Sequence, residues 1–80
     1  MTVDDNKELY RAFGGWIREE RERQELLQKD VADMVDITQT YYSLIERGER
    51  NINLSLALDI CKALRLNFNK FLQLQNKNKK

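Results

Sequence analysis

Apolar residues recur at helical spacing along most of this 80-residue chain, and no segment alternates as a half-buried strand would. Leu9, Phe13 and Ile17 stand four residues apart, so they fall on one stripe of a helix. Four further apolar segments follow, at residues 31–35, 42–45, 54–64 and 68–72. The pattern predicts five short helices and therefore an all-α fold.

Capping residues and glycine mark the expected helix boundaries. Thr38, Asn53 and Asn67 carry side chains that accept hydrogen bonds from the first N–H groups of a helix. Gly48 is expected to end the third helix, because the position after a helix often requires positive φ. Short connections between these helices predict one compact domain.

The two ends of the chain differ from this helical centre. Residues 1–6 are polar and acidic and are predicted to form a flexible arm, whereas the Lys/Asn-rich residues 75–80 are predicted to form a disordered tail. The domain is expected to span residues 7–74. No apolar run approaches the ~18 residues needed to cross a bilayer, and the start is unlike a signal peptide. We therefore expect a cytoplasmic protein without a membrane partner.

The composition excludes several kinds of chemistry. The chain has no histidine and a single cysteine, Cys61. One cysteine forms no internal disulfide, and without histidine it builds no structural zinc site. The commonest general base is also missing. We therefore expect no metal, no cofactor, no small-molecule ligand and no enzymatic activity, and we expect Cys61 to act as a small buried apolar residue.

The segment 28–48 carries the functional signal. It combines a two-turn helix, a tight turn at Asp36, and a second helix that opens with short polar side chains. Ala32, four residues before the turn, lets the two helices meet closely at a steep angle, as in a helix-turn-helix. The N-terminus of the second helix favours a phosphate backbone, and Gln or Thr side chains there reach base edges. The recognition helix is expected at about residues 38–47.

Residues 13–72 resemble the Cro and phage-repressor helix-turn-helix family, also called the XRE family. The most specific stretch is Ser-Leu-Ile-Glu-Arg-Gly at 43–48, and the match covers about three quarters of the chain without a gap. The resemblance implies a five-helix, lambda-repressor-like DNA-binding domain with the helix-turn-helix at its second and third helices. Residues 50–54 also resemble the restriction-modification controller proteins, which are small, free-standing dimers.

The resemblance implies roles for individual side chains. Gln39, Thr40 and Leu44 are expected to read bases in the major groove. Arg21 and Glu46 match positions that form an ion pair in many members of the family. Contacts with the DNA backbone are expected of Gln28, Lys29, Thr38, Tyr41, Ser43, Arg47, Arg50 and Asn51.

Some positions depart from the family pattern. Leu27 stands where Ser or Thr usually caps the second helix. Asp36 and Glu25 replace glycines, and both are expected to adopt the left-handed corner that those glycines occupy. Leu44 is apolar where Gln or Arg is common, so its expected contact is a thymine methyl group.

Apolar residues near the end of the chain exceed what one small core can cover, and such surfaces mark partner sites. The predicted dimer interface consists of Leu56, Phe68, Phe71 and Leu74. The sequence thus predicts a homodimeric transcriptional regulator that binds double-stranded DNA at a pseudo-palindromic operator. The alternative is the antitoxin of a toxin–antitoxin pair, which binds a protein partner and its own promoter.

The charge is nearly balanced, with 14 basic and 13 acidic residues and a net charge of +1. Residues 1–25 hold five basic and seven acidic groups, net −2, and residues 26–80 hold nine and six, net +3. We therefore expect weak non-specific attraction to DNA, with specificity resting on a few directed contacts.

Overall fold

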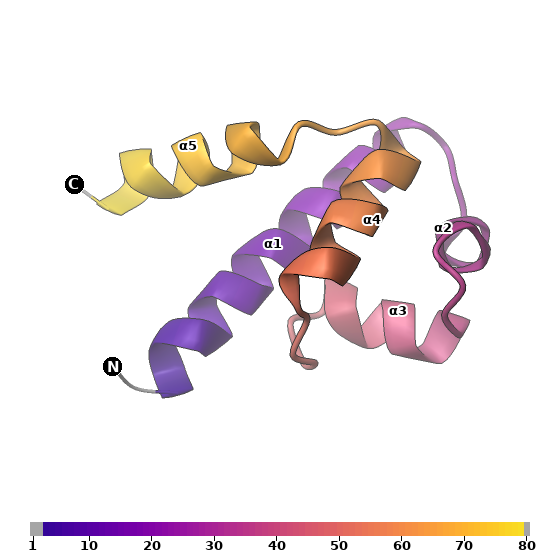
Figure 1. The fold of residues 1–80 in the computed structure, drawn as a ribbon, viewed down its shortest axis with the longest axis horizontal. Helices are drawn as coiled ribbons and strands as arrows, with labels where there is room; N and C mark the ends of the chain where they lie inside the picture. Colours follow the sequence, from indigo (N-terminus) through magenta and orange to yellow (C-terminus); the bar gives the residue numbers. More distant parts are fainter. Residues whose placement is uncertain (1–2, 80) are drawn as a thin grey trace.

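The computed structural model describes residues 3–79, with side chains described for residues 7–75. Over this range the chain forms five helices and no strand, which confirms the predicted all-α fold. The helices are α1 (Val3–Arg23), α2 (Gln28–Met34), α3 (Gln39–Glu46), α4 (Leu54–Leu64) and α5 (Phe68–Lys79). In Figure 1, α1 runs diagonally across the picture and passes behind α4. Helices α2 and α3 lie on the right, away from the two chain ends. Helix α5 runs back to the left and ends at the C-terminus.

All five helices contribute to one core. The largest fully buried side chains include Ile17, Tyr42 and Ile60, one each from α1, α3 and α4. The other buried apolar residues are Phe13, Val31, Ala32, Ile45, Ala57, Cys61, Leu64 and Phe71. The core thus lies where α1 is crossed by α3 and α4.

An aromatic cluster attaches α5 to α1. The ring centroid of Phe71 lies 5.4 Å from that of Phe13, 5.2 Å from that of Trp16 and 5.8 Å from that of Phe68. Each such pair contributes roughly 0.5–1.5 kcal/mol beyond its area burial. Phe71 is only 3% exposed. The prediction that Phe71 forms leftover apolar surface for a dimer is therefore wrong, because this ring fills the α1–α5 contact of its own chain.

The face that each helix buries also differs in part from the prediction. Leu9 is exposed although it shares a stripe with Phe13 and Ile17. In α4 the apolar spacing predicts one face with Leu54, Ala57, Leu58, Cys61 and Leu64, but Leu54 and Leu58 are exposed and Ile60 is buried. Apolar spacing identifies a broad stripe on a helix, but contact with the other helices decides which edge of that stripe is covered.

Both ends of the described chain are more helical than predicted. Helix α1 begins at Val3, so residues 3–6 are helical. Helix α5 continues to Lys79, into the predicted disordered tail. Neither stretch contains the glycine or proline that would end a helix. Residues 1, 2 and 80 lie outside the described part of the chain. No helix within residues 3–79 is long and apolar enough to span a bilayer.

Helices α1 to α4 all end in the same left-handed turn. Glu25, Asp36 and Arg65 have φ values of 60°, 63° and 60°, and Gly48 has φ 73°. In each case the next residue donates its backbone N–H to the carbonyl five residues earlier, as in a Schellman motif. The four bonds are Leu26 to Arg21, Ile37 to Ala32, Glu49 to Leu44 and Leu66 to Cys61. The predictions for Glu25, Asp36 and Gly48 are confirmed, and Arg65 is an addition.

Gly14 allows the backbones of α1 and α3 to touch. A Cβ atom at this position would overlap the carbonyl oxygens of Ile45 and Glu46. Gly15, its neighbour in the chain, has open space where a Cβ would lie. Of these two neighbouring glycines, only Gly14 is required for the close packing of α1 on α3.

This difference yields a matched pair of substitutions. Gly14→Ala is expected to lower the free energy of unfolding by about 3 kcal/mol or more, because the clash is with backbone that has little room to move. Gly15→Ala is expected to raise it by up to ~1 kcal/mol, because alanine is the better helix former. Urea unfolding followed by circular dichroism measures both. A similar loss in the two variants would contradict the α1–α3 contact.

Candidate nucleic-acid interface

Helices α2 and α3 form the helix-turn-helix unit. Val31 and Ala32 are fully buried in α2, and Ile45 is buried in α3. The backbone N–H of Ile37 donates to the carbonyl oxygen of Ala32 at 3.0 Å and closes the turn between the two helices. The small side chain of Ala32 is therefore buried at the residue whose carbonyl group closes the turn.

Thr38 fixes the start of α3. Its Oγ1 accepts a hydrogen bond from the backbone N–H of Tyr41 at 3.1 Å, so its hydroxyl serves as the N-cap. Helix α2 lacks a capping side chain at Leu27. There the carboxylate of Asp30 instead accepts a hydrogen bond from the backbone N–H of Leu27 at 2.8 Å, which offsets the missing cap.

The exposed face of α3 carries the residues expected to read bases. Gln39 and Thr40 are exposed in its first turn, and Leu44 is half-buried one turn later. Tyr42 and Glu46 point the other way, into the core. Short polar side chains therefore stand beside the free N–H groups of a helix start, where the helix dipole favours negative charge.

A basic group follows at the other end of α3. Arg47 is its C-cap residue, and Arg50 and Asn51 follow in the loop before α4; all three are exposed. The guanidinium carbon of Arg50 lies 5.0 Å from the centroid of the Tyr41 ring, which is within cation–π range. Tyr41, Arg50 and Asn51 line one shallow hollow together with Glu49. Ser43 is half-buried on the same helix.

The first turn of α2 provides the remaining candidates for backbone contacts. Nε2 of Gln28 donates to Oε1 of Glu46 at 3.0 Å, so one of its two amide hydrogens is already used. Nζ of Lys29 lies 2.9 Å from Oδ2 of Asp33, and this hydrogen bond raises the pKa of the Lys29 ammonium group. Both side chains therefore have partners within their own chain.

A buried ion pair connects these elements. Arg21 donates from Nε to Oε2 of Glu46 at 2.7 Å and from Nη2 to Oε1 at 3.1 Å. Its third nitrogen, Nη1, donates to the carbonyl oxygen of Leu26 at 2.8 Å. Glu46 is 5% exposed and Arg21 is 9% exposed. With Gln28 as a further donor, the carboxylate ties α1, the start of α2 and the end of α3 together.

The surroundings of Glu46 keep it ionised. Burial alone would raise the pKa of its carboxyl group, but hydrogen bonds from Arg21 and Gln28 outweigh burial and hold the pKa below its usual value. The hydroxyl of Tyr42 is buried beside this pair, and burial raises its pKa. This hydroxyl makes no hydrogen bond within the part of the chain that the structure describes.

A helix-turn-helix family model matches residues 17–71 of the chain, which is more than half of its length. The chain belongs to the XRE-type helix-turn-helix family. The matched residues include both helices of the unit, the buried ion pair and the basic group after α3. No curated protein matches the sequence.

Solved structures of gene regulators share this fold. The restriction-modification controller protein C.AhdI from Aeromonas hydrophila is 29% identical with a TM-score of 0.73, covering 78% of this chain and 94% of its own. The controller protein C.Esp1396I is 28% identical with a TM-score of 0.75, covering 86% and 91%. The clp gene regulator ClgR from Corynebacterium glutamicum is 25% identical with a TM-score of 0.76, covering 80% and 83%. The family and these neighbours support a DNA-binding transcriptional regulator.

The helix-turn-helix unit also contains two carboxylates that the sequence analysis left without a role. Asp33 pairs with Lys29, and Oε1 of Glu49 lies 3.4 Å from Nη2 of Arg47. The sequence signal for these pairs is the spacing of opposite charges: Asp33 follows Lys29 by four residues on α2, and Glu49 follows Arg47 by two residues after α3. Two of the three cations predicted to contact phosphates, Lys29 and Arg47, are therefore paired within their own chain, whereas Arg50 lies over the Tyr41 ring.

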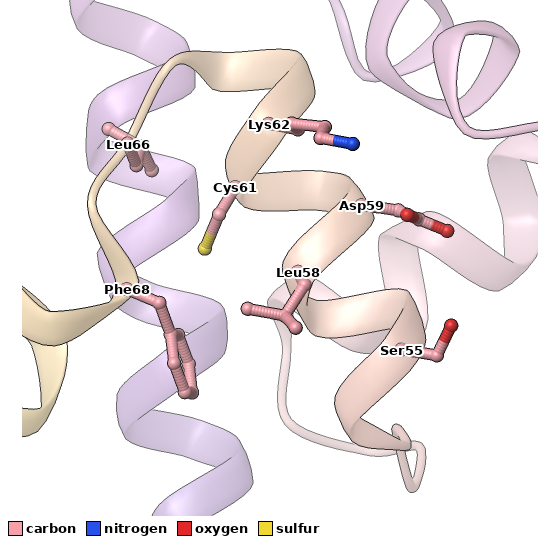
Figure 2. A pocket seen from close by; sticks show the side chains of 7 residues that line it. All are labelled: Ser55, Leu58, Asp59, Cys61, Lys62, Leu66 and Phe68. Carbon is pink, nitrogen blue, oxygen red and sulfur yellow. The ribbon is translucent and has the colours of Figure 1, made fainter.

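The predicted dimer residues fall into three environments. Phe71 is buried, Leu56 and Phe68 are half-buried against the core, and Leu74 is exposed. Figure 2 shows a hollow beside α4 into which Leu58, Cys61 and Phe68 point.

Burial raises the pKa of the Cys61 thiol to about 11, so this cysteine is a poor nucleophile.

Breaking the buried pair is expected to be costly. Arg21→Ala or Glu46→Ala should lower the free energy of unfolding by about 3–5 kcal/mol, because the remaining charge stays buried without its partner. Replacing both, as Arg21→Met with Glu46→Leu, should cost much less. Arg18→Ala removes the exposed pair with Glu22 and should change stability by at most about 1 kcal/mol. Equal losses in the single and double variants, measured by urea unfolding, would contradict this role.

Acid is expected to weaken the fold through Glu46. Its pKa is lower in the folded chain than in the unfolded chain, so the stabilisation is complete above about pH 5 and is lost as the pH falls through the lowered pKa. Between about pH 5 and about pH 3, the free energy of unfolding should fall more steeply for the natural chain than for the double variant, which lacks this carboxylate. Parallel curves would show that Glu46 is not the responsible group.

Proposed function

We propose that this protein is a sequence-specific regulator of transcription that binds double-stranded DNA through α3. The observation that carries the proposal is the exposed polar first turn of α3, which a buried ion pair holds within a matched helix-turn-helix domain. In this role α3 enters the major groove, and Gln39 and Thr40 meet base edges. Leu44, one turn on, meets a thymine methyl group.

The backbone contacts flank this helix. Arg47, Arg50 and Asn51 follow α3 and meet phosphates on one side of the groove. Gln28 and Lys29 at the start of α2 meet phosphates on the other side, with Tyr41 and Ser43 at the edge of the groove. These contacts position the protein on DNA, whereas Gln39 and Thr40 supply the sequence preference.

We further propose that the protein acts as a homodimer through α4 and α5. Leu58 and Leu74 are 44% and 42% exposed, and Phe68 lies beside Leu58 in the hollow of Figure 2. Exposed apolar side chains on these two helices favour contact with a second copy of the chain. Two recognition helices about 34 Å apart then match the half-sites of a pseudo-palindromic operator. Sedimentation at micromolar concentrations tests the dimer, and a monomer both free and on DNA would contradict it.

A second apolar hollow favours the alternative of an antitoxin with a protein partner. It lies between α1, α4 and α5 and includes the exposed Leu9, Leu54 and Leu72. A stable complex with the product of a neighbouring reading frame, formed on co-expression, would support this alternative. Loss of that complex in Leu9→Ser with retained DNA binding would assign the two activities to separate surfaces.

The reading role of α3 is tested on a duplex obtained by binding-site selection. Gln39→Ala with Thr40→Ala should weaken binding to that duplex by about 1–3 kcal/mol per lost contact and leave binding to unrelated DNA nearly unchanged. Arg47→Ala should instead weaken binding to all duplexes alike and reduce the salt dependence. Arg18→Ala, on α1, serves as the control. Equal affinity for all sequences in the natural chain would overturn the proposal.

A further inference from the structure

The turn after α3 differs from the other three Schellman turns in one residue. The residue that donates the closing backbone hydrogen bond is apolar and half-buried in the turns after α1, α2 and α4: Leu26, Ile37 and Leu66. An apolar residue at this position commonly packs against the end of its own helix. After α3 the same position is Glu49, which is exposed. Packing therefore does not explain why a glutamate stands at this position. The backbone hydrogen bond of Glu49 is nonetheless similar in length to those of the residues that close the other three turns.

The turn places this carboxylate next to a cation of the proposed interface. The backbone N–H groups of Gly48 and Glu49 donate to the carbonyl oxygens of Ile45 and Leu44 at 3.0 and 2.9 Å, which fixes the path of the chain. Oε1 of Glu49 then lies 3.4 Å from Nη2 of Arg47. The side chains are 59% and 57% exposed, so both remain accessible to a third charged group.

The same carboxylate lines the hollow formed with Tyr41, Arg50 and Asn51. A phosphate that approaches this hollow meets the guanidinium group of Arg50, the amide of Asn51 and the negative charge of Glu49. Glu49 faces Nη2 of Arg47, and a bidentate contact with phosphate through the end of the guanidinium group uses this nitrogen too. Phosphate and Glu49 therefore compete for Arg47.

We propose that Glu49 is an internal competitor of the DNA backbone, which pairs with Arg47 in the free protein and lowers affinity for all DNA sequences alike. This inference rests on the proposed function. Because the contact is with phosphate, Glu49 reduces non-specific binding without choosing a sequence. Because Glu49 lowers the affinity, a higher concentration of the protein is needed to occupy the operator.

The expected size follows from the exposure of the pair. An exposed ion pair is worth at most about 1 kcal/mol, which corresponds to a change of up to about fivefold per subunit. A dimer that makes the contact twice gains up to about 25-fold from removal of both carboxylates.

The test compares Glu49→Gln with Glu22→Gln in the full-length chain. Glu22 makes an exposed ion pair with Arg18 at 3.2 Å and lies 3.8 Å from Nη2 of Arg21; its substitution changes the net charge equally, but it lies on α1. Affinity is measured at several salt concentrations on the selected duplex and on an unrelated duplex. Glu49→Gln should bind both duplexes about two- to 25-fold more tightly with an unchanged ratio between them, and Glu22→Gln should match the natural chain.

A third variant separates pairing from general repulsion. In an Arg47→Ala background, Glu49→Gln should give a clearly smaller gain than in the natural chain, because the cation that it releases is absent. A full gain in that background, or no gain from Glu49→Gln alone, would overturn the inference while leaving the DNA-binding function intact. Failure of the natural chain to bind any DNA would overturn the proposed function and this inference together.

Discussion

The buried pair of Arg21 and Glu46 is the interaction on which the arrangement of this protein depends. It joins the end of α3 to α1, and through Gln28 and the carbonyl oxygen of Leu26 it also fixes the start of α2. The carboxylate of Glu46 thus accepts hydrogen bonds from α1 and from α2. Its partner Arg21 also donates to the carbonyl oxygen of Leu26, just before α2. Because two charges are removed from water here, the arrangement tolerates little displacement, and the unit formed by α2 and α3 is held as one piece.

Close backbone contact between α1 and the end of α3 adds to the support that the ion pair gives. Gly14 lets α1 lie directly on the carbonyl groups at the end of α3, and a side chain at Gly48 would overlap Arg11. Helix α3 is therefore supported from behind along its final turn. Its first turn, with Gln39 and Thr40, projects away from that support. A rigid support behind an exposed polar turn suits the proposed entry of α3 into a groove at a defined angle.

Carboxylates of the same chain pair with two of the cations at the candidate interface. Lys29 has Asp33 as its partner, and Arg47 has Glu49. The guanidinium group of Arg50 lies over the Tyr41 ring, which orients it without neutralising it. A surface of this kind attracts DNA weakly at long range, so recognition depends on the few contacts made after docking. The near-neutral net charge of +1 is consistent with the proposal that specificity rests on a few directed contacts.

The sequence by itself determined the helices, their caps and the corner residues Asp36 and Gly48, because these depend on local hydrogen bonds and backbone preference. Resemblance to the family also identified the Arg21–Glu46 pair. Only the tertiary structure decided that Phe71 is buried and Leu58 exposed, because helical spacing does not set the rotation of a helix against its neighbours. It also decided the pairing of Glu49 with Arg47, since that contact depends on the path of the turn after α3.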